Sequence, residues 1–215
     1  YLTLRALLAM EDLCFVSVWS PTFLTLLAEA LRRDFGTLLA DMEHGTWSVP
    51  VDAELRAALA PALPARPRLA RDLRRLFGRR APDDLALIWP RLALISCWTD
   101  AHAARAGAGM RAHFPGVEVQ GKGLLATEGV VSFPLLDAGG PVAAVTSHFL
   151  EFIPAGAVDG PLGVEALETG ATYEVLLTTS GGLYRYRLRD LVRVERWHHG
   201  VPVLSFLGRA DLTSD

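Results

Sequence analysis

Residues 170–215 constrain the fold of this 215-residue chain more than any other segment. Two β-rich runs, residues 172–179 and 183–188, flank a Ser-Gly-Gly sequence, and a glycine-rich break between such runs is typical of a β-hairpin. In the second run, Tyr or Leu alternates with Arg, which predicts a strand with one buried and one polar face. The pattern places Asp190 at the end of that strand.

A carboxylate at a strand end suits the binding of a vicinal diol, because its two oxygens can each accept a hydrogen bond from one ribose hydroxyl. In the structural alternative, Asp190 ends the strand and pairs with Arg187 or Arg189. This segment alone does not decide between the two. Residues 121–129 favour the diol, because there an apolar strand end runs into a Thr-Glu pair bounded by glycines.

Four phrases occur in order along the chain, in residues 88–92, 123–129, 149–154 and 184–190, with Gly208-Arg209 beyond the last. Together they resemble the adenylate-forming enzymes and, more narrowly, the auxin-responsive promoter (Gretchen Hagen) family of acyl-acid amido synthetases. Their joint occurrence is far more specific than any one phrase.

The resemblance implies an α/β fold, as part of the large N-terminal domain of an adenylate-forming enzyme, with a mixed sheet, flanking helices and a β-rich subdomain. We expect residues 1–215 to form a partial large domain, mainly helical over 1–90 and α/β to β-rich over 91–215. The family's Ser/Thr/Gly-rich phosphate loop and its C-terminal lid domain with a catalytic lysine have no match in the sequence. We therefore expect a fragment that is inactive by itself.

The residues themselves predict a similar order of elements. Ser20-Pro21 indicates the start of a helix that runs to about residue 41. Its expected buried residues are Phe23, Leu24, Leu27, Leu31, Phe35 and Leu38. Two further helical stretches are expected within residues 52–77, then a buried parallel strand at 92–97 and a helix at 101–114. Further strand candidates lie at 117–120, 124–126, 142–145 and 148–153.

By motif position, the resemblance assigns roles to five residues. The Thr127 hydroxyl is expected to contact phosphate and the Glu128 carboxylate to help hold Mg²⁺. Leu124 stands where the family has an aromatic residue that stacks on adenine. Asp190 matches the acid that binds the ribose hydroxyls, and Arg209 an arginine near the ribose and phosphate. Without the resemblance, the Thr-Glu pair is a helix cap or a solvated pair, and Arg209 forms a surface salt bridge.

Other polar residues have structural interpretations. Glu151 is given no chemical role, and an acid paired across the sheet is the alternative. His198-His199 indicates an exposed turn, and Cys14 and Cys97, both in apolar runs, indicate buried thiols in a reducing compartment. The arginine-rich residues 66–80 are interleaved with Leu and Phe at helical spacing, which indicates a solvated helix face and not a nucleic-acid surface.

The expected activity is that of an acyl-acid amido synthetase, which uses ATP and Mg²⁺ to adenylate a small carboxylic acid and then transfers the acyl group to an amine such as an amino acid. Acyl transfer to a thiol, as in acyl-CoA ligases, and a non-catalytic nucleotide-binding remnant are the alternatives. A net charge of -3 and charges inside the apolar N-terminal region argue against nucleic-acid binding and against membrane binding. We expect a cytoplasmic location. The oligomeric state stays open.

Overall fold

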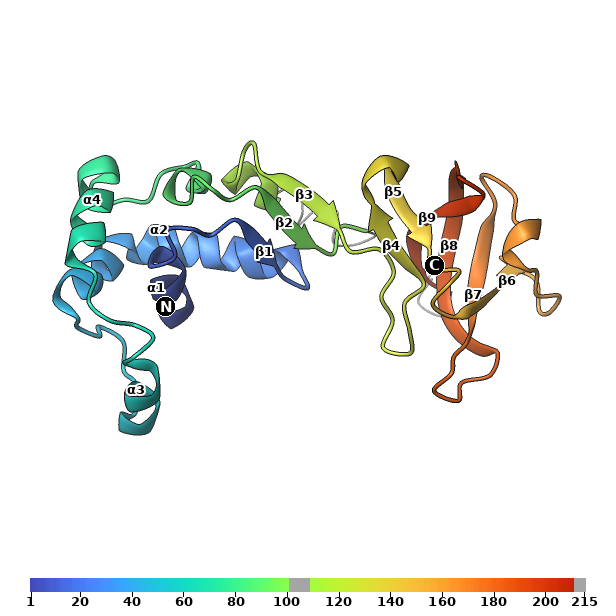
Figure 1. Cartoon of the computed structure of the whole chain (residues 1–215), viewed down its shortest axis with the longest axis horizontal. Helices are drawn as coiled ribbons and strands as arrows, with labels where there is room; N and C mark the ends of the chain where they lie inside the picture. Colours follow the sequence, from blue (N-terminus) through green and yellow to red (C-terminus); the bar gives the residue numbers. More distant parts are fainter. Residues whose placement is uncertain (101–108, 211–215) are drawn as a thin grey trace. The chain divides into compact units, whose positions relative to one another are not determined.

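The computed structural model describes residues 1–100 and 109–210 (Figure 1). The chain divides into two compact units, one of residues Tyr1–Ser96 and Arg105–Val119, the other of residues Cys97–Ala104 and Gln120–Asp215. No helix in the described ranges is long and apolar enough to cross a membrane.

The first unit combines helices with a small sheet. Its helical elements are α1 (Leu2–Leu8), α2 (Pro21–His44), α3 (Ala53–Leu59), α4 (Pro67–Phe77) and the 3-10 helix η1 (Leu85–Ile88). Strands β1 (Phe15–Ser17), β2 (Leu94–Cys97) and β3 (Glu118–Gly121) form a sheet in the order β1-β2-β3. Because β1 and β2 are parallel and β2 is largely buried, the predicted buried parallel strand is confirmed. Of the helix predicted at 101–114, residues 109–113 are helical, and residues 101–108 lie outside the described ranges.

Helix α2 begins as its sequence predicts. The Ser20 side chain accepts a hydrogen bond from the Thr22 amide at 3.3 Å, Pro21 occupies the first turn, and Gly45 with φ 71° ends the helix. The buried stripe contains Leu24, Ala28, Leu31, Phe35, Leu38, Leu39 and Met42. The prediction for Phe23 is wrong: it is 57% exposed, because one helical step of about 100° turns it away from that stripe.

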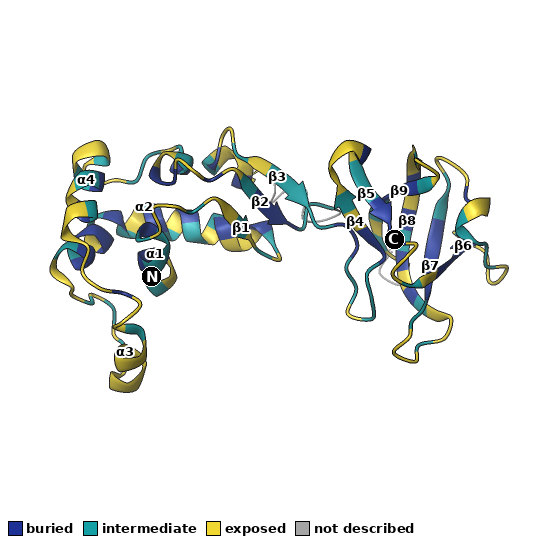
Figure 2. Ribbon diagram, viewed as in Figure 1, coloured by how far each residue is buried: buried dark blue, intermediate teal, exposed yellow. Residues whose placement is uncertain are grey.

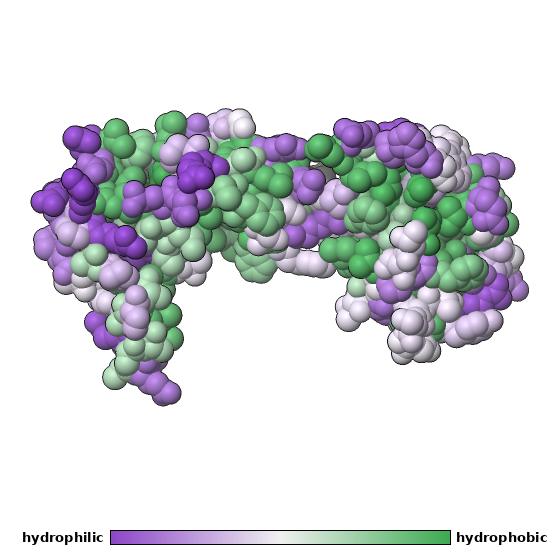
Figure 3. Space-filling view, viewed as in Figure 1, coloured by the Kyte–Doolittle hydropathy of each residue, from purple (hydrophilic) through white to green (hydrophobic). Residues whose placement is uncertain are grey.

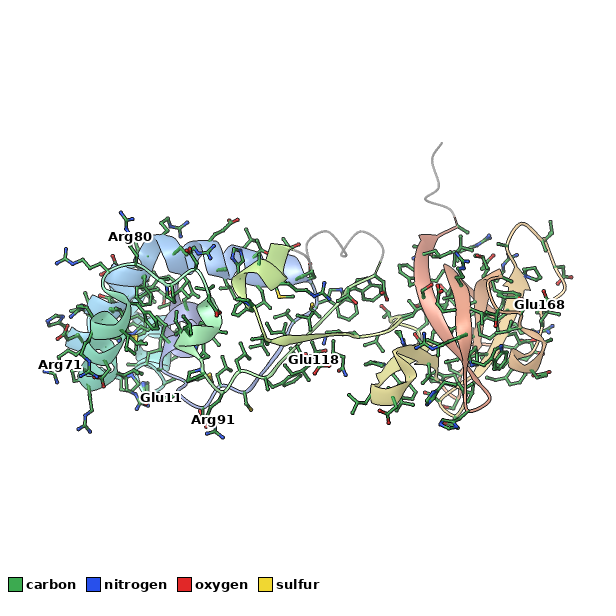
Figure 4. All side chains as sticks on the ribbon, turned by 90° about the horizontal axis from the view of Figure 1, so that it is seen from above. Glu11, Arg71, Arg80, Arg91, Glu118 and Glu168 are labelled. Atoms are coloured by element: carbon green, nitrogen blue, oxygen red, sulfur yellow. The ribbon has the colours of Figure 1, made fainter. Side chains whose placement is uncertain are left out.

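Helix α4 carries the arginine-rich face. Ala70 and Leu73 are buried, whereas Arg71 and Arg80, which follows the helix, are exposed and point away from the unit (Figure 4). Hydrophilic residues accordingly gather over α4 in the space-filling view (Figure 3). The solvated helix face is confirmed. Of the two cysteines, Cys97 is buried as predicted, but Cys14 is exposed, and both are free thiols.

The second unit is built on a six-stranded sheet in the order β4-β5-β9-β8-β7-β6, in which each pair of neighbouring strands is antiparallel. The strands are β4 (Ser132–Leu135), β5 (Gly140–Ala143), β6 (Phe149–Pro154), β7 (Thr172–Thr178), β8 (Tyr186–His198) and β9 (Val201–Arg209), with 3-10 helices η2 (Leu136–Ala138) and η3 (Val164–Ala166) between them. One face packs into a core with Phe152, Val175 and Val192, and strands β6 and β7 are buried along most of their length (Figure 2).

The predicted hairpin is confirmed as β7 and β8, but β8 differs from the prediction. It runs to His198, so Asp190 lies inside the strand and not at its end. The expected burial of the tyrosines is also wrong, since Tyr184 is 81% and Tyr186 41% exposed. The positive φ at Arg185, between the two tyrosines, interrupts the simple alternation. The strand continues past Asp190 because its later residues pair with both β7 and β9.

The turn between β8 and β9 gives a stability prediction. His199 and Gly200 have φ 48° and 79°, the left-handed pair that Asn-Gly adopts most readily. We expect His199→Asn to raise the free energy of unfolding by on the order of 0.5–1 kcal/mol, because histidine is strained in this region. Urea unfolding monitored by far-UV circular dichroism measures it. His198→Asn, one residue earlier in the regular strand, is the control and should give no gain.

Candidate functional site

Thr127 and Glu128 occupy the tip of a tight turn in the second unit. Ala126 and Gly129 exchange two backbone hydrogen bonds of 3.0 and 3.2 Å, and Leu125 pairs with Val130 beyond them. The turn leaves Thr127 exposed and Glu128 half-buried. No helix follows, so the helix-cap alternative is wrong, and both side chains are accessible to a ligand.

The start of this turn is held by Leu124. Its amide donates to Ser132 Oγ at 2.9 Å, and its carbonyl accepts from the Val131 amide at 2.9 Å. Its side chain is only 3% exposed and belongs to the core of the unit. Leu124 therefore packs into the core, and its place beside adenine stays a prediction. The next residue, Leu125, is half-buried.

Two glycines set the turn against the sheet. Gly123 has φ 72°, and a Cβ there would lie 2.5 Å from the Ser132 carbonyl oxygen. A Cβ on Gly129 would lie 2.9 Å from both the His148 ring and the Leu177 side chain. The close approach brings the His148 imidazole to the base of the Thr127-Glu128 turn, a neighbour that the sequence did not indicate.

Asp190 and Arg209 are brought together by β8 and β9, where they are paired in register. Asp190 is 8% exposed. Arg209 Nη2 donates to the Leu188 carbonyl at 3.2 Å, and the Ala210 amide donates to the Arg189 carbonyl at 2.8 Å. The two residues assigned to the nucleotide from separate phrases are therefore direct neighbours.

The arginines before Asp190 contact a different acid. Arg187 donates to Glu174 on β7, through Nε to Oε1 at 3.0 Å and Nη2 to Oε2 at 2.5 Å, and Arg189 Nε lies 3.8 Å from Glu174 Oε1. Glu174 is 6% exposed. Sequence reasoning missed it, although an acid on a strand that pairs with an arginine-bearing strand is a usable signal.

Glu151 has the structural role that was the alternative for it. Arg185 Nε lies 2.9 Å from Oε2 and 3.2 Å from Oε1 of Glu151, and Arg185 Nη2 also donates to this carboxylate. These hydrogen bonds hold the pKa of Glu151 below its usual range, although burial acts in the opposite direction. The acid is paired across the sheet.

Glu128 is the residue that could bind Mg²⁺. Within residues 1–100 and 109–210, no group of three or more His, Cys, Asp or Glu is placed to hold a metal ion. Mg²⁺ usually keeps several waters and takes one or two carboxylates together with substrate phosphates. A single accessible carboxylate on the turn beside Thr127 fits that mode of binding.

The first unit contains an apolar cavity of ≈ 230 Å³. Its walls come from α1, β1, α2 and the segment around η1, and the only hydroxyls among its lining side chains belong to Thr3 and Ser17. The lining includes Leu4, Leu7, Val16, Leu24, Leu27, Leu31, Trp89 and Ile95. A cavity of this kind accepts a hydrocarbon or aromatic group and provides no charge.

Known proteins match both units. The GH3 family N-terminal domain matches residues 1–119, and the GH3 family central domain matches residues 142–209. An Oryza sativa subsp. japonica protein named "Probable indole-3-acetic acid-amido synthetase GH3.6" is 33% identical over 210 residues, covering 86% of this chain and 42% of that protein. An Arabidopsis thaliana protein named "Indole-3-acetic acid-amido synthetase GH3.10" is 48% identical over 54 residues, covering 25% of this chain and 9% of that protein.

A solved structure shows the same fold. The structure titled "AtGH3.15 acyl acid amido synthetase in complex with 2,4-DB" has a TM-score of 0.84 at 20% identity, covering 97% of this chain and 38% of that one. The predicted α/β class is confirmed. The chain spans less than half the length of these relatives, 42% in the first case. Since one family model alone matches more than half of the sequence, the chain belongs to the GH3 family.

Proposed function

We propose that this chain is part of an ATP-dependent acyl-acid amido synthetase, which adenylates a carboxylic acid and passes the acyl group to an amine such as an amino acid. The observation that carries the proposal is the pairing of Asp190 with Arg209 in a chain of the GH3 family. The names of its relatives, indole-3-acetic acid-amido synthetase and jasmonoyl-L-amino acid synthetase, support the same reaction. The proposal includes the prediction that residues 1–215 form part of the large domain of an adenylate-forming enzyme.

Four side chains then have a role. The Asp190 carboxylate accepts hydrogen bonds from the ribose hydroxyls, and the Arg209 guanidinium offers positive charge beside it. The Thr127 hydroxyl donates to a phosphate oxygen, and Glu128 holds Mg²⁺ through its carboxylate. Mg²⁺, when bound, neutralises phosphate charge.

The proposed reaction has two steps, adenylation and acyl transfer. A substrate carboxylate oxygen attacks the α-phosphorus, and the bond to pyrophosphate breaks. An amine nitrogen then attacks the acyl carbon, loses a proton, and AMP leaves. The residues of this chain contribute by holding the nucleotide in line with the incoming carboxylate.

The apolar cavity of the first unit supports an acyl acid with an apolar body, whose hydrocarbon part would fill the space beside Leu27. We expect Leu27→Trp, which fills that space, to raise the KM for the acyl acid about tenfold and to leave the KM for ATP unchanged. Steady-state kinetics with each substrate varied in turn measure both values. Leu26→Trp, on the same helix at a position that is 56% exposed, is the matched control.

The test of the proposed function is pyrophosphate release by the complete protein, with a panel of small carboxylic acids. Release with some acid, followed by an amide product with an amino acid, supports the proposal. A thioester formed with coenzyme A instead would identify an acyl-CoA ligase. No release with any acid, despite ATP binding, would indicate a non-catalytic nucleotide-binding remnant. We expect residues 1–215 alone to release none.

A reducing, cytoplasmic location remains part of the proposal. It is supported by the two free thiols, Cys14 and Cys97.

A further inference from the structure

Glu174 is a nearly buried acid that holds two arginines. It lies on β7, is 6% exposed, and receives both a bidentate hydrogen-bond pair from Arg187 and the more distant charge of Arg189. Its carboxylate therefore connects β7 to two points of β8.

Of those two points, Arg187 lies directly before an irregular part of β8 and Arg189 lies inside it. In the register, Leu176 pairs with Arg187 and Glu174 pairs with Leu191, so two steps along β7 correspond to four steps along β8. The extra length is a bulge at Leu188, Arg189 and Asp190, in which Arg189 has φ 63°. On the side of β7 the bulge has no regular ladder to fix it, so side-chain contacts hold its residues there.

The opposite side of the bulge is fixed by β9. Arg209 donates to the Leu188 carbonyl, and the Ala210 amide donates to the Arg189 carbonyl. On the side of β7, the ion pairs of Glu174 supply the corresponding contacts. Asp190 thus stands in a segment held from both neighbouring strands.

We propose that Glu174 is a positioning residue for nucleotide binding: by holding Arg187 and Arg189, it fixes the bulge that presents the Asp190 carboxylate to the ribose. This inference rests on the proposed function. We assign Glu174 a positioning and not a catalytic role, because its carboxylate is occupied by the two arginines.

The chain offers a matched control in Glu151. This acid lies on the neighbouring strand β6, is 8% exposed, and forms a bidentate ion pair with Arg185. Arg185 precedes β8 and lies outside the bulge. Removal of the Glu151 charge therefore breaks a comparable ion pair without releasing Asp190.

The experiment measures the Kd of ATP by titration calorimetry, together with KM and kcat for pyrophosphate release, in the complete protein. Glu174→Gln should raise the Kd and the KM of ATP about tenfold and leave the KM of the acyl acid unchanged. Glu151→Gln should leave the affinity for ATP at its original value. Equal losses of ATP affinity in both variants would overturn the proposal, because they would show a general effect on the sheet.

A double-mutant cycle makes the test sharper. If Glu174 acts through Asp190, then Glu174→Gln should have no further effect on ATP affinity in the Asp190→Ala background. Independent, additive losses would overturn the positioning role. If Asp190→Ala alone leaves ATP affinity unchanged, the proposed nucleotide site itself fails. If only Asp190→Ala weakens binding, the site stands and the role of Glu174 fails.

A second variant covers the case in which Glu174→Gln does not fold. Arg187→Lys retains the positive charge but cannot form the two parallel hydrogen bonds with Glu174. It should raise the Kd of ATP by a smaller factor than Glu174→Gln does, and an unchanged Kd would overturn the proposal.

Discussion

Asp190→Ala is expected to lower kcat/KM for ATP in the complete protein about 100-fold, because it would remove the two proposed hydrogen bonds from the ribose hydroxyls to a charged carboxylate. The loss should appear in pyrophosphate release and in ATP affinity alike, with the KM of the acyl acid unchanged. Asp159→Ala, which removes an exposed acid from a loop of the same unit, is the control. An Asp190→Ala protein with full activity would contradict the assignment of this residue to the ribose.

Asp41→Ala is expected to have the largest effect on stability, about 3 kcal/mol. Asp41 is 1% exposed and accepts four hydrogen bonds: from Tyr1 Oη at 2.8 Å, Thr46 Oγ1 at 2.6 Å, the Ser48 amide at 2.7 Å and Ser48 Oγ at 2.8 Å. Alanine leaves all four donors without this acceptor. Urea unfolding followed by tryptophan fluorescence is a suitable measurement, because Trp47 lies between two of the donor residues. Asp52→Ala, the loss of an exposed helix cap, should cost only about 1 kcal/mol.

The contribution of Asp41 depends on pH in a defined direction. Burial raises the pKa of this carboxyl, but hydrogen bonds from Thr46, Ser48 and Tyr1 outweigh burial and leave the pKa below its usual value. A lowered pKa in the folded state means that the stabilisation is fully present above the unfolded-state pKa of about 4 and is lost as the pH falls through the folded-state pKa. The difference in unfolding free energy between the original protein and Asp41→Ala should therefore be constant at neutral pH and shrink below about pH 4. A difference that grew on acidification would contradict the role of this carboxylate.

Local rules predicted the elements that depend on neighbouring residues. The start of α2 follows from Ser20-Pro21, and the hairpin of β7 and β8 follows from the Ser-Gly-Gly sequence between two β-rich runs. The motif drew attention to Asp190, but the prediction that the strand ends there is wrong. The bulge in β8 depends on the pairing of this strand with β7 and β9. Simple alternation contains no information on that pairing.

The contacts that sequence reasoning missed connect residues far apart in the chain. Glu174 meets Arg187 only after β7 and β8 pair, and the His148 ring approaches Gly129 only after the segment between them has folded. The exposure of Phe23 and Cys14 has the same origin, since an apolar residue type does not show which side of an element the core occupies. Tertiary packing decides these cases.

The hairpin of β8 and β9 has a consequence for local opening. Its turn lies at His199-Gly200, and the pair formed by Asp190 and Arg209 is the register pair furthest from that turn. A hairpin closes from its turn outwards and frays from its open end. The pair that we propose contacts the nucleotide therefore lies where fraying begins, and a bound nucleotide would hold that end closed. Slower hydrogen exchange of the Ala210 amide in the presence of ATP would then report the same equilibrium that sets nucleotide affinity.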